Sequence, residues 1–437
     1  MSIIILQVGQ CGNQVGYSFF KTIHDDCYLQ NNTKADNDYT NESIERFFYH
    51  CQSGKLESRG IQIDMEEKVI SNQNMDNNKW CYAMNSKYIQ KQGSGNNWAN
   101  GYCNNGPKVI QKLEDLMRFQ FERADSIDGV LITMSVAGGT GSGVGTLMSR
   151  FIKENYPLKT LVNHLVWPYK QGEVSVQAYN ALLSVANILG QNEDGLMDST
   201  LSADSVIIHE NDLLHSVCQN RLALPKIGVD ELNNLICHQL ASVLQPVDQT
   251  KLPLSELVLT NIIHPDYRLL KLRNVPYTAE NCRAFTTDTW HQLMKQINQM
   301  ILTDSVAEEG LDWNVKVNNK LCANLTNHIV LRGHGCDSIA RESLALNNPR
   351  MYSNYLGNHT LNIWSHCRKF NGYEKSITAL TNGRDSVCAL DNATAKAWNM
   401  FNTDAFLYQY EKYGLSRSHF LDCFANTEQI IHNYKIL

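Results

Sequence analysis

The chain has 437 residues, 43% of them hydrophobic, and this is enough apolar material for two or three globular domains. Its net charge of −6 gives no basic field, so the composition argues against a nucleic-acid partner. The sequence has no run of about 18 apolar residues, so we expect no segment that spans a membrane.

The 13 cysteines are scattered along the chain, and the sequence contains no Cys-x-x-Cys pair. In a chain without a basic leader they are typical of small buried hydrophobic residues in a reducing compartment. None of the neighbouring His and Cys residues has a second pair at the spacing of a zinc site, so we predict no metal site from them. These neighbours are His24/Cys27, His334/Cys336 and His366/Cys367.

Residues 3–8 form an apolar run that is typical of a strand rather than a signal peptide, because no basic residue precedes it. Gly9 and Gly12 follow, and apolar residues then recur at the spacing of a helix. This order of strand, glycine turn and helix predicts a phosphate contact. Gln10 and Cys11 would present a side chain and backbone N–H groups to it.

Two polar segments come next. Residues 30–41 are rich in Asn and Asp and predict an exposed loop. Residues 61–66 alternate like a strand and end in two carboxylates, Asp64 and Glu66, which point to the same side if the strand continues. This arrangement suits a Mg²⁺ ion held partly through water. A solvated strand end has the same pattern, so the residues alone leave both interpretations open.

Two glycine-rich turns follow. In residues 92–101 the Asn96 side chain could donate to a terminal phosphate. The densest run, residues 135–145, lies between an apolar strand at 129–134 and a helix at 146–152. Glycine lets N–H groups approach a ligand and the helix start adds unpaired donors, so we predict a phosphate cradle rather than a flexible link. Its expected contacts are Ser135, Gly138, Gly139, Thr140 and Gly141.

Neither of the two common nucleotide motifs is present in the sequence. It contains no Gly-x-x-x-x-Gly-Lys-Ser/Thr. A dinucleotide fingerprint would place the glycines directly after the first strand, with an acidic residue about 20 residues later. Here the densest glycine run begins only at residue 135.

Strands and helices alternate through about residue 245, which predicts an α/β fold with a doubly wound, mainly parallel sheet. From residue 252 prolines punctuate shorter elements, and the end of the chain is helical and rich in aromatic residues. We therefore predict a Rossmann-like nucleotide-binding domain at 1–245. A smaller α+β domain at 246–382, which includes a connecting core helix, and a C-terminal helical hairpin at 383–437 would follow.

Four motifs resemble signatures of the tubulin superfamily, and their order and spacing match over essentially the whole chain. They are GQCGNQ at 9–14, GNNWA at 95–99, AGGTGSG at 137–143 and WPY at 167–169. Further segments resemble the delta class, namely residues 90–98, 172–180, 238–246 and 396–401. Residues 433–437 carry no glutamate-rich run of the kind usual in tubulins of the microtubule wall, so we expect a specialised member.

The resemblance implies that the chain binds GTP or GDP with Mg²⁺, and it assigns a role to particular residues. Near the phosphates it places Gln10, Cys11, Gln14 and Asn96, with Thr140, Gly141 and their neighbours as the cradle. Near magnesium it places Asp64 and Glu66, and near the ribose Gln177. Asn211 and Asn233 match guanine-reading positions, where one amide can accept from guanine N–H groups and donate to its carbonyl.

Three residues depart from the family pattern. Ala137 stands at a usual glycine, Glu67 at a usual proline, and Val229 where an aromatic side chain usually stacks on the base. Losing that stacking would cost roughly 0.5–1.5 kcal/mol of nucleotide affinity. We therefore expect Val229 to lower nucleotide affinity and Ala137 to change the geometry of the loop slightly, while the site itself remains.

In the superfamily, the next subunit of a filament supplies an acidic residue that positions the water attacking GTP. Glu256 best matches that residue, and a solvated helix residue is the alternative interpretation. Electrostatic assistance to phosphoryl transfer needs a carboxylate within hydrogen-bond reach of water. We therefore expect at most a weak GTPase that a partner completes in trans.

The resemblance further implies a cytoplasmic, cytoskeletal protein that acts at centrioles or basal bodies and in cilium assembly. Its partners would be other tubulins, through longitudinal or lateral contacts, and centriolar proteins. A conventional filament-forming tubulin is the first alternative, and a polymerisation assay would identify it. A dinucleotide-dependent enzyme is the second, although the missing fingerprint argues against it.

Overall fold

The structure is a computed structural model. It describes residues 1–28, 34–51, 54–73, 79–172, 174–190, 201–247, 253–283, 285–305, 308, 311–315, 323–339, 345–353 and 360–437. The chain divides into two compact units. The first unit contains residues 1–17, 45–210 and 387–436, and the second contains residues 18–44, 211–386 and 437. The three-segment division predicted above stays a prediction.

The first unit is built on a parallel sheet. Each described pair of neighbouring strands in it is parallel. In spatial order the strands are β9 (Ser205–Glu210), β8 (Thr160–Trp167), β7 (Ile127–Ser135), β1 (Ser2–Val8), β4 (Gly60–Asp64) and β6 (Lys87–Ile89). β1 and β4 are buried along their whole length, because a parallel sheet is covered on both faces.

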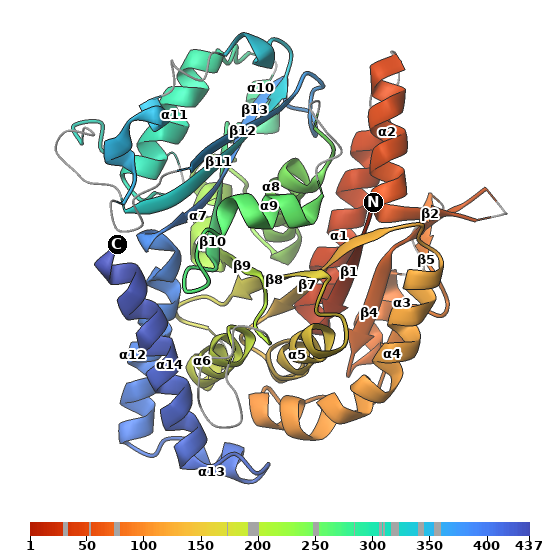
Figure 1. The fold of residues 1–437 in the computed structure, drawn as a ribbon, viewed down its shortest axis with the longest axis vertical. Helices are drawn as coiled ribbons and strands as arrows, with labels where there is room; N and C mark the ends of the chain where they lie inside the picture. Colours follow the sequence, from red (N-terminus) through yellow and green to blue (C-terminus); the bar gives the residue numbers. More distant parts are fainter. Residues whose placement is uncertain are drawn as a thin grey trace. The chain divides into compact units, whose positions relative to one another are not determined.

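The helices of the first unit lie along this sheet. α4, α5 and α6 lie side by side on one face (Figure 1). The unit contains α3 (Glu67–Gln73), α4 (Gly106–Glu122), α5 (Gly145–Asn155), α6 (Gln177–Ile188), α12 (Cys388–Asn402), α13 (Leu407–Glu411) and α14 (Arg417–Ile436), and α1 (Gly9–Tyr28) begins in it. A small separate sheet joins β2 (Phe48–His50), β3 (Leu56–Ser58) and β5 (Trp80–Tyr82).

The strand order indicates at which edge of the sheet a ligand would bind. From β1 the chain first moves outward to β4 and β6, and it then returns to β7 on the other side of β1. The segments that follow β1 and β7 therefore lie at a switch point, where the carboxyl ends of parallel strands form a crevice. The predicted doubly wound, mainly parallel sheet is confirmed.

The C-terminal helices, which the sequence predicted to be helical, pack against α6. α12 and α14 lie along α6, and the core between them is rich in aromatic rings. Tyr179 of α6 packs edge-on against Tyr410 and Phe420, with ring centroids 5.5 and 5.1 Å apart. Trp98, from the segment after β6, belongs to the same core.

The second unit is built on a mixed sheet, which agrees with the predicted α+β character. In spatial order its strands are β12 (Thr360–His366), β11 (Asn324–Gly333), β13 (Lys375–Gly383) and β10 (Leu269–Val275). β11 pairs parallel with β12, and β13 pairs antiparallel with both β11 and β10. The helices are α2 (Lys34–Phe47, mostly in this unit), α7 (Asn211–Asn220), α8 (Val229–Leu244), α9 (Leu254–Asn261), α10 (Glu280–Arg283) and α11 (Trp290–Leu302).

Helix α2 corrects the prediction of an exposed loop at 30–41, of which residues 30–33 lie outside the described ranges. Tyr39, Thr40, Ser43, Ile44 and Phe47 are buried and form one helical stripe. Two of these side chains are polar, and both form hydrogen bonds. The Ser43 hydroxyl donates to Gln245 Oε1 at 2.9 Å and the Thr40 hydroxyl to the Cys27 carbonyl at 3.3 Å. This stripe carries too little apolar character for the sequence pattern to show it.

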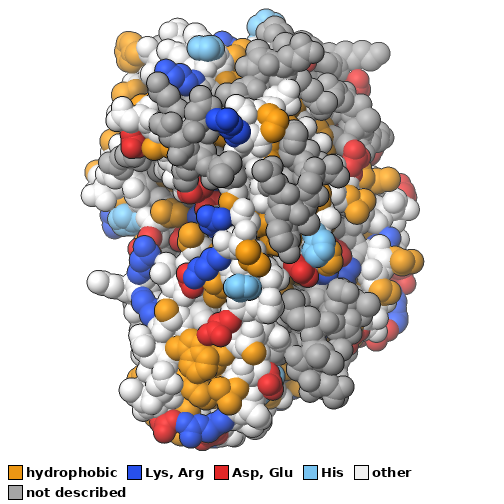
Figure 2. All heavy atoms as spheres, turned by 60° about the vertical axis from the view of Figure 1, so that its left-hand side comes forward, with side chains coloured by type: hydrophobic (Ala, Val, Ile, Leu, Met, Phe, Trp, Pro, Cys, Tyr) orange, Lys and Arg blue, Asp and Glu red, His pale blue; other side chains and the backbone are white. Residues whose placement is uncertain are grey.

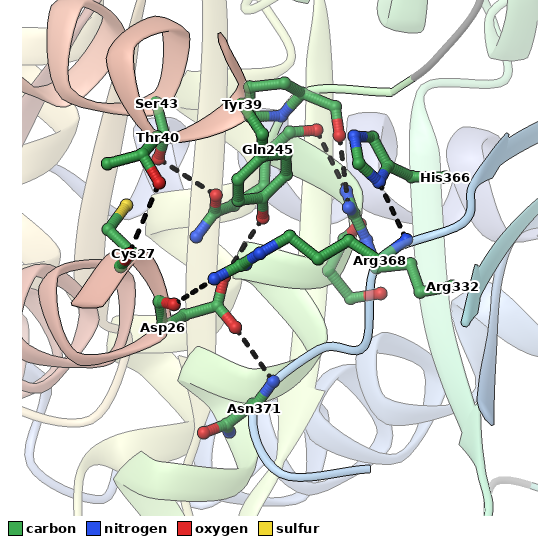
Figure 3. Close-up of polar contacts among 12 residues, drawn as sticks. Asp26, Cys27, Tyr39, Thr40, Ser43, Gln245, Arg332, His366, Arg368 and Asn371 are labelled. Carbon is green, nitrogen blue, oxygen red and sulfur yellow. Dashed lines mark hydrogen bonds and ion pairs between the residues drawn. The ribbon is translucent and has the colours of Figure 1, made fainter. Parts of the chain in front are cut away.

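A buried ion pair lies beside α2 in the second unit (Figure 3). Arg368 Nη1 lies 2.7 Å from Asp26 Oδ2, and both side chains are at most 4% exposed. Asp26 also accepts from the Tyr39 hydroxyl at 3.1 Å and from the Asn371 backbone N–H at 2.9 Å. We call Asp26, Tyr39, Arg368 and Asn371 the Asp26 cluster.

Within the described ranges, no helix is both long and apolar enough to cross a membrane. On the face shown in Figure 2, acidic and basic side chains are interspersed, and the described residues form no broad basic field there.

Candidate functional site

The segments after β1 and β7 touch through their backbones. Gly9 has φ +72°, and a Cβ atom there would lie 3.0 Å from the backbone nitrogen of Gly141. A Cβ on Gly141 would lie 2.7 Å from the Ser135 carbonyl oxygen. Both positions therefore need glycine, one for its conformation and close approach and the other for space. The predicted cradle and the predicted first-strand turn lie together at the switch point.

The segment after β6 packs onto the same place. A Cβ on Gly139 would lie 2.6 Å from the backbone nitrogen of Asn97, and one on Gly143 would lie 2.3 Å from the Trp98 carbonyl oxygen. Gly138 is different, because its Cβ would meet Asn96 Oδ1 at an ordinary 3.5 Å. The Asn96 amide therefore lies against Gly138. We call residues 138–143 the cradle.

Side-chain hydrogen bonds hold these segments in place. The Thr140 hydroxyl donates to Ser94 Oγ at 3.2 Å, and Asn105 Nδ2 donates to the same oxygen at 2.9 Å. Asn180 of α6 joins three segments. Its Nδ2 donates to the carbonyls of Asn96 at 2.9 Å and Ala137 at 2.7 Å, while its Oδ1 accepts from the Trp98 N–H at 3.0 Å.

Asn180 is in turn tied to the C-terminal helices. The Tyr410 hydroxyl of α13 donates to Asn180 Oδ1 at 2.7 Å. Sequence reasoning missed Ser94 and Asn180 as site residues. No sequence signal singles out Asn180, because α6 also carries the polar residues Gln177, Ser184 and Asn187.

The cradle leads directly into a helix. A π-helical turn at Thr140–Val144 continues as α5. Gly139 is the N-cap and contributes no side-chain cap, so the first N–H groups of the turn are available to a ligand or to water. Such a helix start favours an anion through its N–H groups and its dipole.

The first turn of α1 presents the other predicted phosphate contacts. Gln10 is exposed, and Cys11 and Gln14 are half-buried. Asn13 Nδ2 donates to the Gly9 carbonyl at 2.9 Å and to the Ile63 carbonyl at 3.1 Å, which ties this turn to the end of β4. Burial raises the pKa of the Cys11 thiol to about 12, so the thiol is neutral and does not repel a phosphate.

Asp64 and Glu66 lie in different surroundings. β4 ends at Asp64, so the strand alternation that would align the two side chains does not reach Glu66. Asp64 is buried, its Oδ1 accepts from the Met65 N–H at 2.7 Å, and its Oδ2 has no hydrogen-bond partner among the described residues. Burial raises the pKa of Asp64 to about 6.

Glu66 is exposed, and a Cβ on Gly93 would lie 3.0 Å from its Oε1. A carboxylate oxygen without a partner in a buried position, with a second carboxylate close in sequence, fits a hard cation such as Mg²⁺. Such a cation would restore the ionised form that burial of Asp64 disfavours.

Gln177 begins α6. Its Nε2 donates to the Tyr169 carbonyl at 2.8 Å, which fixes the orientation of the amide. Its Oε1 is buried and has no hydrogen-bond partner in the part of the chain that the structure describes. An acceptor in this position could receive a hydroxyl donor, as a ribose contact requires.

The remaining predicted residues lie in the second unit. Asn211 begins α7, and Asn233 lies in the second turn of α8. Asn233 is 3% exposed, and its Nδ2 has no hydrogen-bond partner within the described ranges. Val229, the first residue of α8, is 54% exposed. Glu256 is exposed in the first turn of α9, where a neighbouring molecule could reach it.

Comparison with known proteins identifies relatives over the whole chain. Residues 2–219 match a family model described as the GTPase domain of the Tubulin/FtsZ family. The tubulin delta chains of Macaca fascicularis and Homo sapiens are 35% and 34% identical to this chain. Each alignment covers 99% of this chain and 99% of the relative. The tubulin beta chain of Candida albicans is 29% identical over 312 residues, which are 69% of this chain and 67% of that protein.

Proposed function

The chain belongs to the tubulin superfamily and most resembles its delta chains. From that premise we propose that it binds GTP at the cradle and acts in the assembly of centrioles, basal bodies and cilia. The observation that supports the site most is the meeting of the segments after β1, β6 and β7. Glycines permit backbone contact there, and the start of a helix leaves N–H groups available.

The proposed phosphate contacts come from these three segments. Cradle N–H groups around Gly139, Thr140 and Gly141 would donate to phosphate oxygens, with Ser135 and Gly138 alongside. Gln10, Cys11 and Gln14 would approach from the first turn of α1, and Asn96 from the segment after β6. Asn96 has φ +52°, a conformation that turns and ligand sites tolerate in asparagine.

Mg²⁺ would be held by Asp64 and Glu66, in part through water. The ion would neutralise phosphate charge and orient the terminal phosphate. The support for this assignment is the buried Asp64 oxygen, whose surroundings otherwise disfavour the charged carboxylate. Glu66 would contribute charge from the exposed side of the site.

Guanine recognition would rest on Asn211 and Asn233, and the ribose would contact Gln177. The buried Nδ2 of Asn233 supplies a donor for the guanine carbonyl, and a ligand would remove the cost of leaving that donor unsatisfied. Val229 would cover the base without aromatic stacking, which lowers affinity by roughly 0.5–1.5 kcal/mol.

Hydrolysis would be slow in the isolated chain. Glu256 would position the attacking water only in a neighbouring subunit's site, and its exposure on α9 is compatible with that role. The partners would be other tubulins and centriolar proteins, and the protein would reside with the cytoplasmic cytoskeleton. A conventional filament subunit is the second candidate, since a tubulin beta chain is also similar over two thirds of the chain. Assembly of the purified protein into microtubule-like filaments would favour that candidate.

The test is to denature the purified full-length protein and to chromatograph the small molecules released. The proposal predicts GTP or GDP at up to one per chain. A released dinucleotide or adenine nucleotide would contradict it. A Gly139→Ala variant is the control, because the clash with the Asn97 backbone should lower the amount of retained nucleotide.

A further inference from the structure

A second site lies in the second unit, where β11 and β12 end. These strands are parallel, and their register pairs Arg332 with His366. The residues that follow the two strands therefore meet at one edge of the sheet. Cys367 comes directly after β12, and Cys336 begins a short turn after β11. The sequence hides this meeting, since 31 positions separate the two cysteines.

Three potential ligand atoms converge there. Cys336 Sγ lies 3.5 Å from Cys367 Sγ. The Asp337 carboxylate lies beside both thiols, at 2.9 Å from Cys367 Sγ and 3.7 Å from Cys336 Sγ. One donor atom from each of the three residues lies within 4.8 Å of the others. We call these residues the Cys336 cluster.

The surrounding structure fixes part of this cluster and leaves part open. Cys336 is 1% exposed and belongs to the apolar core of the second unit, so its position is held by packing. Gly335, with φ +77°, forms the turn before it, and the Trp290 indole N–H donates to the neighbouring His334 carbonyl at 3.0 Å. Asp337 and Cys367 are exposed, so an ion from solution can reach the donor atoms.

From this geometry we infer that the Cys336 cluster binds a thiophilic divalent cation of the Zn²⁺ class. Two thiolates at about 2.3 Å from a tetrahedral Zn²⁺ lie about 3.8 Å apart, close to the 3.5 Å observed between the sulfurs. A disulfide would need the same atoms at about 2.05 Å. Binding displaces one proton from each thiol, and the carboxylate gives the third anionic ligand.

The fourth position would be filled by water, because the cluster opens to solvent at Asp337 and Cys367. The carboxylate distinguishes this site from a redox pair. Two thiols can form a disulfide without a neighbouring carboxylate. A bound cation, in contrast, gains a ligand and a negative charge from the carboxylate. The inference is independent of the nucleotide site.

The test uses the full-length protein, freed of metal and kept reduced with a phosphine, with Co²⁺ as the probe. We expect one equivalent of Co²⁺ to give thiolate-to-cobalt charge-transfer absorption that Zn²⁺ then abolishes. Removing even a hydrogen bond to a metal ligand costs about 10–100-fold in affinity, so Cys367→Ser and Asp337→Asn should each weaken binding by at least tenfold. Cys282→Ser, at an exposed cysteine outside the cluster, should leave binding unchanged.

Three results would overturn the inference. The first is a Co²⁺ spectrum without the charge-transfer band, and the second is an unchanged affinity in Cys367→Ser. The third is a Cys336–Cys367 disulfide that forms equally well in wild type and Asp337→Asn while neither protein binds Co²⁺. Both substituted side chains are exposed, so the variants are expected to fold, and circular dichroism checks this.

Discussion

The cradle and the Asp26 cluster are both polar parts of the molecule, but they are built in opposite ways. In the cradle, backbone meets backbone, and Gly139, Gly141 and Gly143 leave no space for a Cβ atom. In the Asp26 cluster, side chain meets side chain, and one buried carboxylate is satisfied by a guanidinium, a hydroxyl and an N–H. The cradle should therefore be sensitive to added atoms and the Asp26 cluster to a removed charge.

Among the substitutions proposed here, Asp26→Asn should have the largest effect on stability. It keeps the shape of the side chain but leaves the Arg368 guanidinium buried without its carboxylate, which costs about 3–5 kcal/mol. Urea unfolding measures the change. Glu114→Gln is the matched control, because it also removes a carboxylate from an ion pair. Both side chains of that pair, Glu114 and Arg118, are about 60% exposed, and exposed pairs contribute at most about 1 kcal/mol to stability. Equal losses in the two variants would contradict this view of the Asp26 cluster.

Gly139→Ala tests the cradle by adding one carbon atom. Its Cβ would lie 2.6 Å from the Asn97 backbone nitrogen, so two backbone segments must separate at a cost of about 1–3 kcal/mol. Gly138→Ala adds the same atom at 3.5 Å from the Asn96 side chain and should change stability by less than about 1 kcal/mol. Thermal unfolding of the two variants measures the difference. If Gly138→Ala lowers the unfolding temperature more than Gly139→Ala does, close backbone contact is not what excludes a Cβ atom from the cradle.

The second unit should also lose stability in mild acid. Burial lowers the pKa of His238 to about 4 and that of His328 to about 3, whereas both titrate near 6.5 in the unfolded chain. At pH values between the folded and the unfolded pKa, the unfolded chain binds more protons than the folded chain. The free energy of unfolding therefore has its full value above about pH 6.5 and decreases as the pH drops toward about 4. The expected loss is about 1.4 kcal/mol per histidine for each pH unit.

Unfolding midpoints at pH 7 and pH 5 measure this loss. His328→Gln should flatten the dependence by one proton, and His432→Gln, at an exposed position, should leave it unchanged. The same slope in wild type and His328→Gln would mean that His328 is not a neutral buried group.

Tyr410→Phe should have the smallest effect, because it removes one hydrogen bond behind the cradle. Asn180 Oδ1 would lose the hydroxyl at 2.7 Å but keep the Trp98 N–H at 3.0 Å. We expect a stability loss of about 0.5–1.5 kcal/mol and weaker nucleotide retention. Tyr408→Phe, on an exposed ring of the same helix, is the control. If Tyr410→Phe retains as much nucleotide as the wild type, the C-terminal helices do not support nucleotide binding at the site.

The sequence predicts the parallel sheet and its glycine-rich edge well, because each depends on local pattern. β1 and β7 are mostly apolar, and the segments after them contain glycines at positions where a Cβ atom would meet the backbone of another segment. The resemblance also supplies Asn233, whose buried amide nitrogen has no hydrogen-bond partner in the described part of the chain.

Other features depend on partners far along the chain. Helix α2 is buried partly through Thr40 and Ser43, whose hydrogen bonds come from elsewhere in the second unit, so apolar periodicity misses it. Asn180 acquires its role only when three segments meet around it. The Cys336 cluster exists only because β11 and β12 end in register. Rules based on sequence spacing therefore do not bring these three residues together.

Equilibrium dialysis of the nucleotide-free full-length protein against GTP, GDP, ATP and NAD⁺ in the presence of Mg²⁺ tests guanine-nucleotide binding at the cradle. We expect one site per chain that binds GTP and GDP and from which neither ATP nor NAD⁺ displaces them. Equal binding of ATP, or preferential binding of NAD⁺, would contradict it.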